Sequence, residues 1–120
     1  MGNLKILIVE DDEGSSQLLS YMLNSMAKEI ISVTNGFEAV EACKNNTDID
    51  LILMDIQMET LNGYKATEQI RKFNKNVIII AQTALALSGD REKSILAGCD
   101  DYITKPIHKN DLVKLIREYL

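Results

Sequence analysis

The sequence predicts an α/β fold in which a five-stranded parallel sheet is covered by helices on both faces. Short apolar runs alternate along the 120 residues with longer segments whose apolar residues return every three or four positions, and this order repeats five times. Such runs suit strands that are buried on both faces, and strands that alternate with helices favour a parallel sheet. A chain of this length forms one core, so we expect residues 1–120 to be a single domain.

Five stretches are candidate strands. Leu4–Val9, Leu51–Met54 and Val77–Ala81 are nearly unbroken apolar runs, whereas Ile30–Val33 and Tyr102–Ile103 are weaker candidates. In parallel sheets, ligands bind outside the carboxyl ends of the strands. We therefore expect the functional residues directly after these stretches.

Five apolar stripes at helical spacing alternate with the strands. They consist of Leu18, Leu19, Met22, Leu23 and Met26; Ala39, Val40 and Cys43; Ala66, Ile70 and Phe73; Leu87, Ile95 and Leu96; and Leu112, Leu115, Ile116 and Tyr119. The fourth stripe has the poorest periodicity. Asn110 and Asp111 are the expected start signals of the last helix.

Composition excludes several classes of function. Lys and Arg total 13 against 18 Asp and Glu, which gives a net charge of −5 and disfavours direct binding of nucleic acid. The apolar runs are far shorter than a membrane span, and the first residues do not resemble a secretory signal, so we expect no membrane association. Cys43 and Cys99 are too few for a disulfide framework. We expect both in the core of a cytoplasmic protein.

Residues that carry chemistry follow four of the five strands. Glu10–Glu13 follow the first strand, Asp55 the third, Thr83 the fourth and Lys105 the fifth. Carboxylates that converge raise each other's pKa or recruit a cation, and Mg²⁺ binds through carboxylates, waters and phosphate oxygens. A carboxylate beside that ion can attack phosphorus to give an aspartyl phosphate. An ammonium and a hydroxyl can then hold the phosphoryl oxygens.

Four stretches of the chain resemble the receiver domain of response regulators in two-component signalling. They are "ILIVEDDE", "LILMDIQMETLNGYKA", "IIIAQTALALSGDREK" and "AGCDDYITKP". Each is weak alone, but the four lie in order and span nearly all of the chain. The resemblance implies the flavodoxin-like (βα)5 doubly wound sheet with strand order 2-1-3-4-5, and a signalling function that phosphorylation controls.

The resemblance also implies a metal site and a phosphoacceptor. Glu10 and Asp11 correspond to the acidic pair that binds Mg²⁺ or Mn²⁺, and Asp55 corresponds to the phosphoacceptor, which also contacts the metal. The backbone carbonyl of Gln57 completes the metal site. Asp12 is the next residue along, with a solvated helix start as the alternative for Asp12 and Glu13.

A second group of residues is implied to sense and hold the phosphoryl group. Thr83 and Lys105 contact it, Thr83 and Tyr102 act as switch residues, and the Lys105–Pro106 peptide bond is cis. Tyr102 has a second interpretation as a half-buried core aromatic. His108, the one histidine of the chain, is expected to be a surface residue rather than a phosphoryl donor.

The resemblance implies partners as well. A histidine kinase or a histidine phosphotransfer protein donates the phosphoryl group, and the chain catalyses only its own phosphorylation and dephosphorylation. A downstream protein binds the face of the fourth helix, fifth strand and fifth helix, roughly residues 87–120, where Lys93, Lys109, Lys114 and Arg117 lie. The chain is a monomer or a phosphorylation-dependent dimer. It is either a stand-alone regulator or a receiver domain cut from a hybrid histidine kinase or a longer regulator.

The sequence departs from the family pattern at two places. The family often has Pro-x-x-Asp-Gly where this chain has Glu59 to Gly63, so we expect a looser loop because no proline fixes the backbone there. Leu85, two residues past Thr83, offers no polar group to orient an attacking water. We therefore expect a phosphoryl group that lasts for minutes or longer.

Other functions fit the sequence less well. A small aspartyl-phosphate phosphohydrolase resembles DxDx[TV] after a strand, but Asp55 is followed two residues later by Gln57. A nucleotide-binding fold lacks support because neither GxGxxG nor GxxxxGK[ST] is present. A degenerate receiver that acts only as a docking surface is disfavoured by the complete set of site residues.

Overall fold

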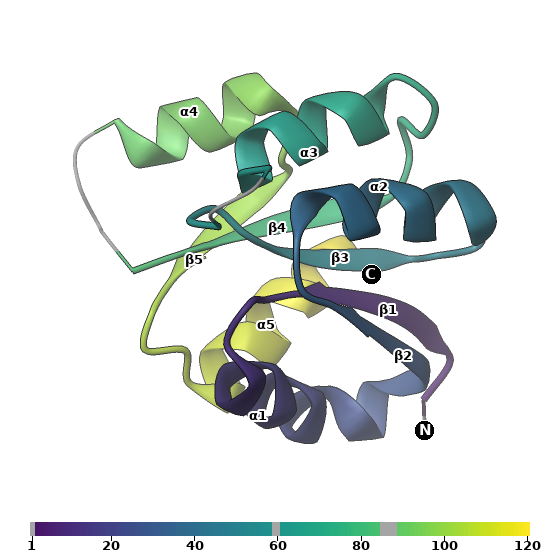
Figure 1. Cartoon of the computed structure of the whole chain (residues 1–120). Coiled ribbons are helices and arrows are strands. Elements are labelled where there is room, and N and C mark those ends of the chain that lie inside the picture. Colours follow the sequence, from purple (N-terminus) through teal and green to yellow (C-terminus); the bar gives the residue numbers. More distant parts are fainter. Residues whose placement is uncertain (1, 59–60, 85–88) are drawn as a thin grey trace.

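The computed structural model describes residues 2–58, 61–84 and 89–120, and their strands form one parallel sheet (Figure 1). The strands are β1 (Leu4–Val9), β2 (Ala27–Val33), β3 (Leu51–Asp55), β4 (Ile78–Thr83) and β5 (Asp101–Thr104). Their order is β2-β1-β3-β4-β5, and each neighbouring pair is parallel. The predicted fold class and strand order are therefore confirmed.

Helices cover both faces of the sheet, with α2, α3 and α4 on one face and α1 and α5 on the other (Figure 1). The helices are α1 (Glu13–Leu23), α2 (Gly36–Asn45), α3 (Gly63–Arg71), α4 (Asp90–Ala97) and α5 (Lys109–Tyr119), with a 3-10 turn, η1 (Asn24–Met26), after α1. Asp12, Asn35 and Asn62 each cap a helix, because their side-chain oxygens accept a backbone N–H three residues on. Among the described residues, no helix is both long and apolar enough to cross a bilayer.

Two apolar cores result from the alternation of side chains along the strands. On β1, Leu7 and Val9 face the core under α2 and α3, whereas Ile6 and Ile8 face the core under α1 and α5. Cys43 and Cys99 are buried and free, as predicted. From Ile6 to Val9 both faces of β1 are apolar and buried, so at this end of β1 the first side chains that can carry chemistry are those that follow the strand.

The predicted stripe of the first helix needs two corrections. Leu18 is 54% exposed, because Leu19, Met22 and Leu23 form the inward stripe and Leu18 lies one residue, or about 100° of helix rotation, away from it. The helix ends at Leu23, so Met26 belongs to η1 rather than to the stripe.

The stripe of the fourth helix was also predicted wrongly. Ile95 and Leu96 are exposed, Leu96 by 86%, while Ser94 and Ala97 face inward. Small residues three positions apart let α4 pack closely, and the larger neighbours then point away from the core. Leu87 lies outside the described residues.

Other boundaries shifted by a few residues. Phe73 lies beyond the end of α3 and is partly exposed. The strand β2 begins at Ala27, three residues before the predicted start, and β4 extends to Thr83, which was predicted to follow it. The helix α5 begins at Lys109 with the exposed His108 as its N-cap residue. His108 is therefore a surface residue, as predicted.

Candidate functional site

The predicted site residues meet at the carboxyl edge of the sheet. Glu10 follows β1, Asp55 ends β3, Thr83 ends β4 and Lys105 follows β5, and these four strands are neighbours in the sheet. Glu10 and Asp55 are only 2% and 3% exposed, and Thr83 is also buried. Buried polar side chains need partners, and Glu10 and Asp55 find them in each other and in Lys105.

Three carboxylates form the centre of the site. Glu10, Asp11 and Asp55 each offer one oxygen, and these three oxygens lie within 4.8 Å of one another. Asp11 is exposed, whereas the other two carboxylates are buried. Carboxylate oxygens are the ligands that Mg²⁺ and Mn²⁺ prefer. The donor set and its spacing therefore fit a hard divalent cation.

Lys105 supplies the balancing positive charge. Its ammonium donates a hydrogen bond to Glu10 Oε1 at 2.8 Å and lies 3.7 Å from Asp55 Oδ2. Its backbone N–H donates to the Thr83 carbonyl at 2.7 Å, which ties the turn after β5 to the end of β4. The Lys105–Pro106 bond is cis, as expected.

The environments of the carboxyl groups separate their proton affinities. Burial and the neighbouring Glu10 raise the pKa of Asp55 to about 7, although the Lys105 charge opposes this. Burial works against the Glu10 carboxylate, but hydrogen bonds with Asp55 and Lys105 hold its pKa below the usual value. Burial opposes the charged form of Lys105, yet its hydrogen bond with Glu10 and the nearby carboxylates raise its pKa. Asp55 is thus the carboxylate that a bound cation would stabilise most.

Backbone groups of the loop after β3 orient the Asp55 carboxylate. The Gln57 N–H donates to Asp55 Oδ1 at 3.1 Å, while the Gln57 side chain is exposed. The role of the Gln57 carbonyl as a metal ligand stays a prediction. Asp12 does not join the cluster of three carboxylates, because its side chain caps α1 by accepting from Ser15, so the helix-start interpretation of Asp12 fits.

Gly63 is a site residue that sequence reasoning did not single out. A Cβ atom at Gly63 would lie 2.3 Å from the Asp55 carbonyl oxygen and 2.9 Å from the Ile56 Cα. The first residue of α3 therefore packs against the backbone that carries Asp55. The Asn62-Gly63 pair was the available signal, since Asn62 caps α3 and only glycine fits the close approach.

The two residues predicted to act as switches lie on neighbouring strands, because Thr83 ends β4 and Tyr102 lies on β5 opposite Ala81. Thr83, with Ile56, Gln57 and Met58, lines part of a cavity of about 590 Å³ beside the carboxylates. Tyr102 is half-buried and packs against the core under α2 and α3. This position fits both a switch residue and a core aromatic residue. Glu59 and Leu85, on which the expectations about loop stiffness and phosphoryl lifetime depend, lie outside the described residues.

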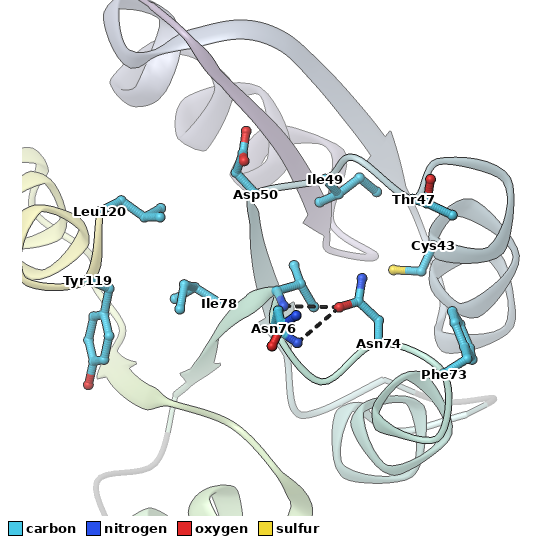
Figure 2. Close-up of a pocket in the computed structure, with 11 residues that line it drawn as sticks. Cys43, Thr47, Ile49, Asp50, Phe73, Asn74, Asn76, Ile78, Tyr119 and Leu120 are labelled. Atoms are coloured by element: carbon cyan, nitrogen blue, oxygen red, sulfur yellow. Dashed lines mark hydrogen bonds between the residues drawn. The ribbon is translucent and has the colours of Figure 1, made fainter.

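A second cavity, of about 560 Å³, opens near the amino ends of β3 and β4 (Figure 2). The polar groups drawn there already serve the fold: the Asn74 carboxamide oxygen accepts the Asn76 and Val77 N–H groups, and Asp50 accepts the Lys5 N–H. This cavity lacks the converging carboxylates and the lysine, so we place the functional site at the carboxyl edge.

Comparison with known protein families gives a match over most of the chain. The model of the response regulator receiver domain matches residues 6–117. This stretch contains every site residue described above.

Two curated relatives differ greatly in length. The chain is 42% identical over 121 residues to the hybrid signal transduction histidine kinase G of Dictyostelium discoideum; the match covers 97% of this chain but only 4% of that protein. It is 34% identical over 117 residues to the polar-differentiation response regulator DivK of Brucella anthropi, where it covers 96% of this chain and 94% of the relative.

Two solved structures share the fold at similar identity. One is the receiver domain of Ssk1 from Saccharomyces cerevisiae, crystallised with the histidine phosphotransfer protein Ypd1; it is 35% identical with a TM-score of 0.90, and the match covers 98% of this chain and 89% of that one. The other is the receiver domain of the sensor histidine kinase PA1611 from Pseudomonas aeruginosa, with a magnesium ion coordinated in its active-site cleft. It is 36% identical with a TM-score of 0.86, covering 99% and 98%.

Proposed function

This chain belongs to the response regulator receiver domain family, whose members are signalling modules of two-component phosphorelays, and we propose that Asp55 is its phosphoacceptor. The observation that carries the proposal is the arrangement of Glu10, Asp11 and Asp55 within 4.8 Å beside the Lys105 ammonium. Asp55 is the member of this group that ends a strand; its carboxylate accepts the Gln57 N–H and lies 3.7 Å from the Lys105 ammonium.

Phosphoryl transfer to Asp55 needs positioning and charge stabilisation rather than further covalent chemistry. An Asp55 oxygen attacks the phosphorus of a phosphohistidine in line, the P–N bond breaks, and its electron pair goes to the imidazole nitrogen, which then takes up a proton. Lys105 turns from Glu10 toward the phosphoryl oxygens and neutralises part of their charge. The Thr83 hydroxyl holds another of these oxygens.

A divalent cation completes the proposed site. Glu10, Asp11, Asp55 and the Gln57 carbonyl would hold Mg²⁺ or Mn²⁺, which neutralises charge on the transferring group. The cluster of oxygen ligands supports this assignment, as does the magnesium ion in the cleft of the related PA1611 receiver domain.

We propose that the phosphoryl donor is a histidine kinase or a histidine phosphotransfer protein. The related Ssk1 receiver domain binds the histidine phosphotransfer protein Ypd1 in its crystal structure. In this chain the exposed Leu18 and Tyr21 lie on α1, which begins directly after the carboxylate cluster. A donor that approaches the carboxyl edge of the sheet would meet these side chains.

The proposed output surface is the face of α4, β5 and α5. A phosphoryl group that draws Thr83 toward itself, and lets Tyr102 turn inward, would favour one arrangement of this face over another. The exposed Ile95 and Leu96 on α4 and the basic residues Lys93, Lys109, Lys114 and Arg117 offer apolar and cationic contacts. A downstream protein or a second copy of the chain could bind there, so both the monomer and the phosphorylation-dependent dimer stay predictions.

The setting of the domain is also a proposal. Residues 1–120 form either a stand-alone regulator, as the length of DivK suggests, or the receiver part of a hybrid kinase, as the Dictyostelium relative suggests. A cytoplasmic location stays a prediction. In either setting, the chain is proposed to catalyse only its own phosphorylation and dephosphorylation.

Intact-mass spectrometry tests the proposal. The protein is incubated with phosphoramidate and Mg²⁺, and we expect a mass increase of one phosphoryl group that EDTA prevents. Asp55→Ala should show no increase, whereas Asp111→Asn, an exposed acid on α5, should behave as the wild type. An unmodified wild type, or a modified Asp55→Ala, would contradict the proposal.

A further inference from the structure

Gln82 is a buried amide whose polar atoms lack a partner. Its side chain is 0% exposed, and neither its Nε2 nor its Oε1 forms a hydrogen bond with any group of the described residues. An unpaired buried amide is costly, and an apolar residue would fit a strand interior better. Such a group in a folded protein calls for a ligand that satisfies it.

The direction of Gln82 follows from the alternation of β4. Ile80 belongs to the core under α1 and α5, and Ala81 to the core under α2 and α3. Gln82 therefore points to the α1 and α5 side. Its backbone carbonyl accepts the Ile56 N–H at 3.0 Å, which fixes β4 against the end of β3 at this position.

On that side Gln82 lines a cavity of about 220 Å³ between α1 and the turn after β5. Its polar lining residues are Glu10, Ser15, Gln82 and Lys105, and its apolar ones are Leu18, Leu19, Met22, Pro106 and Ile107. A water molecule needs roughly 10–15 Å³ of such volume and two to four polar partners. The volume is sufficient, and the Ser15 hydroxyl, which donates to Asp12, keeps its own capacity to accept. The carboxamide, which both donates and accepts, is closed to solvent as it stands and reaches a water in the cavity by a small rotation about its terminal torsion.

Lys105 connects this cavity to the phosphoacceptor. Its ammonium has three N–H groups; one donates to Glu10 at 2.8 Å, and Asp55 Oδ2 at 3.7 Å is beyond hydrogen-bond distance. Two of its N–H groups therefore have no hydrogen-bond acceptor among the described residues. A water on the cavity side would accept from one of them and limit the rotation of the ammonium, which leaves the third N–H for a phosphoryl oxygen.

We propose that Gln82 binds ordered water in this cavity, and that this water accepts a hydrogen bond from the Lys105 ammonium. Gln82 is thereby a positioning residue for phosphoryl transfer to Asp55, acting through water and Lys105. This inference rests on the function proposed above and adds to it a residue outside the family's metal and phosphate contacts.

Substitution of Gln82 separates this role from a structural one. Gln82→Met keeps the length of the side chain and removes both polar atoms, whereas Gln82→Asn keeps the carboxamide and leaves room for one more water. The control is Gln17→Met, the same substitution on the exposed side of α1. The readouts are the maximal rate of phosphorylation by phosphoramidate, the half-saturating concentrations of phosphoramidate and Mg²⁺, and the melting temperature.

For Gln82→Met we expect the maximal rate to fall by about fivefold or more, while the half-saturating concentrations stay within about twofold of the wild type. The melting temperature should equal or exceed that of the wild type, because the buried unpaired amide is gone. Gln82→Asn should recover most of the rate, and Gln17→Met should match the wild type. A wild-type rate in Gln82→Met would overturn the inference, as would an equal loss in both Gln82 variants, because the carboxamide kept in Gln82→Asn would then make no difference to the rate.

Nuclear magnetic resonance of the wild type gives an independent readout that needs no variant to fold. We expect cross-peaks between the Gln82 side-chain amide protons and water, with the sign of a bound water. Their absence overturns the inference even if the Gln82 variants are unfolded. A wild type that shows the cross-peaks but takes no phosphoryl group would instead contradict the proposed function.

Discussion

Asp55 is held between opposing electrostatic effects. Burial and Glu10 favour its protonated form, whereas Lys105 and the Gln57 N–H favour the carboxylate. The balance raises its pKa to about 7, so small changes in the surrounding charge decide whether Asp55 is a nucleophile. This is the reason why a divalent cation would be needed beside Lys105.

The raised pKa predicts how metal-free stability depends on pH. The folded protein binds the Asp55 proton more tightly than the unfolded chain does, so the contribution of Asp55 to stability is present at acidic pH and is lost as pH rises toward about 7. Asp55→Asn cannot ionise and escapes this loss. We therefore expect its advantage in unfolding free energy over the wild type to grow from pH 5 to pH 8 by on the order of 1–3 kcal/mol. Urea unfolding in EDTA at both pH values measures it, and a constant difference would contradict the assigned cause.

At the scale of the elements, the junction between β3 and α3 positions Asp55, the proposed phosphoacceptor. Gly63 begins α3 against the Asp55 carbonyl, and the Gly63 N–H donates to the Ile56 carbonyl at 3.2 Å. The helix start and the strand end therefore share one tightly packed backbone contact. A side chain at this point would push the loop away from the site.

Gly63→Ala is therefore expected to lower stability by about 1–3 kcal/mol and to slow the phosphorylation of Asp55. The control is Gly14→Ala on α1, where a Cβ would have its nearest contact at 3.6 Å. That change should be neutral or stabilising by up to about 1 kcal/mol. Chemical denaturation and the phosphoramidate assay measure both variants; an unperturbed Gly63→Ala would show that the contact is not needed.

Arg71 connects α3 through hydrogen bonds to the segments before β4 and β5. Its guanidinium donates to the carbonyls of Gly98 at 2.8 Å and Val77 at 2.7 Å, and to Asp100 Oδ2 at 2.9 Å. Asp100 Oδ2 also accepts the Ile79 N–H. One side chain thus satisfies backbone groups from two loops, which the sequence does not reveal because the partners lie 6 to 29 residues away.

We expect Arg71→Met to cost about 2–4 kcal/mol, because it leaves carbonyls and a carboxylate without their donor. The matched variant Lys65→Met removes an exposed contact at 3.7 Å to Glu68, which is worth less than about 0.5 kcal/mol. Thermal and urea unfolding compare the two. Equal losses would indicate that Arg71 contributes no more than a surface ion pair does.

The parts of the fold that the sequence predicted are those with an unbroken local signal. The strand at Leu4–Val9 was predicted to the residue because both of its faces are buried. Leu18 and Leu96 were misplaced because helical spacing identifies a stripe but not which edge of the stripe faces the core. Gly63 and Gln82 were overlooked because a close backbone approach and a buried amide without a partner become visible only when the packed surroundings of the residue are known.

For the whole molecule, we predict that Mg²⁺ stabilises the fold through the carboxylate cluster. A cation that binds only the folded protein adds about 1.4 kcal/mol at ten times its dissociation constant, or roughly 3–6 °C for a domain of this size. Asp11→Asn should lose most of this shift. Its metal-free melting temperature should equal or exceed that of the wild type, because Asp11 is exposed and burial and the neighbouring Glu10 raise the pKa of its carboxyl group, so its charge is unfavourable without a cation. Differential scanning calorimetry with Mg²⁺ or EDTA measures it, and an equal shift in Asp11→Asn would place the ion elsewhere.

The arrangement of the whole molecule supports a single carboxylate, Asp55, as the proposed phosphoacceptor. Four neighbouring strands (Figure 1) bring Glu10, Asp55, Thr83 and Lys105 to one edge of the sheet, and Asp11 adds the third carboxylate. The sequence has 18 acidic side chains, and Asp55 is the one proposed to take up phosphorus.

Mapping the acyl phosphate tests this claim most directly. After reaction with phosphoramidate and Mg²⁺, borohydride reduces a phosphorylated aspartate to homoserine, and peptide sequencing by mass spectrometry locates the changed residue. We predict homoserine at position 55 and unmodified aspartate at Asp11 and Asp12. Homoserine at either of those two positions, or at none of the three, would contradict the assignment of Asp55.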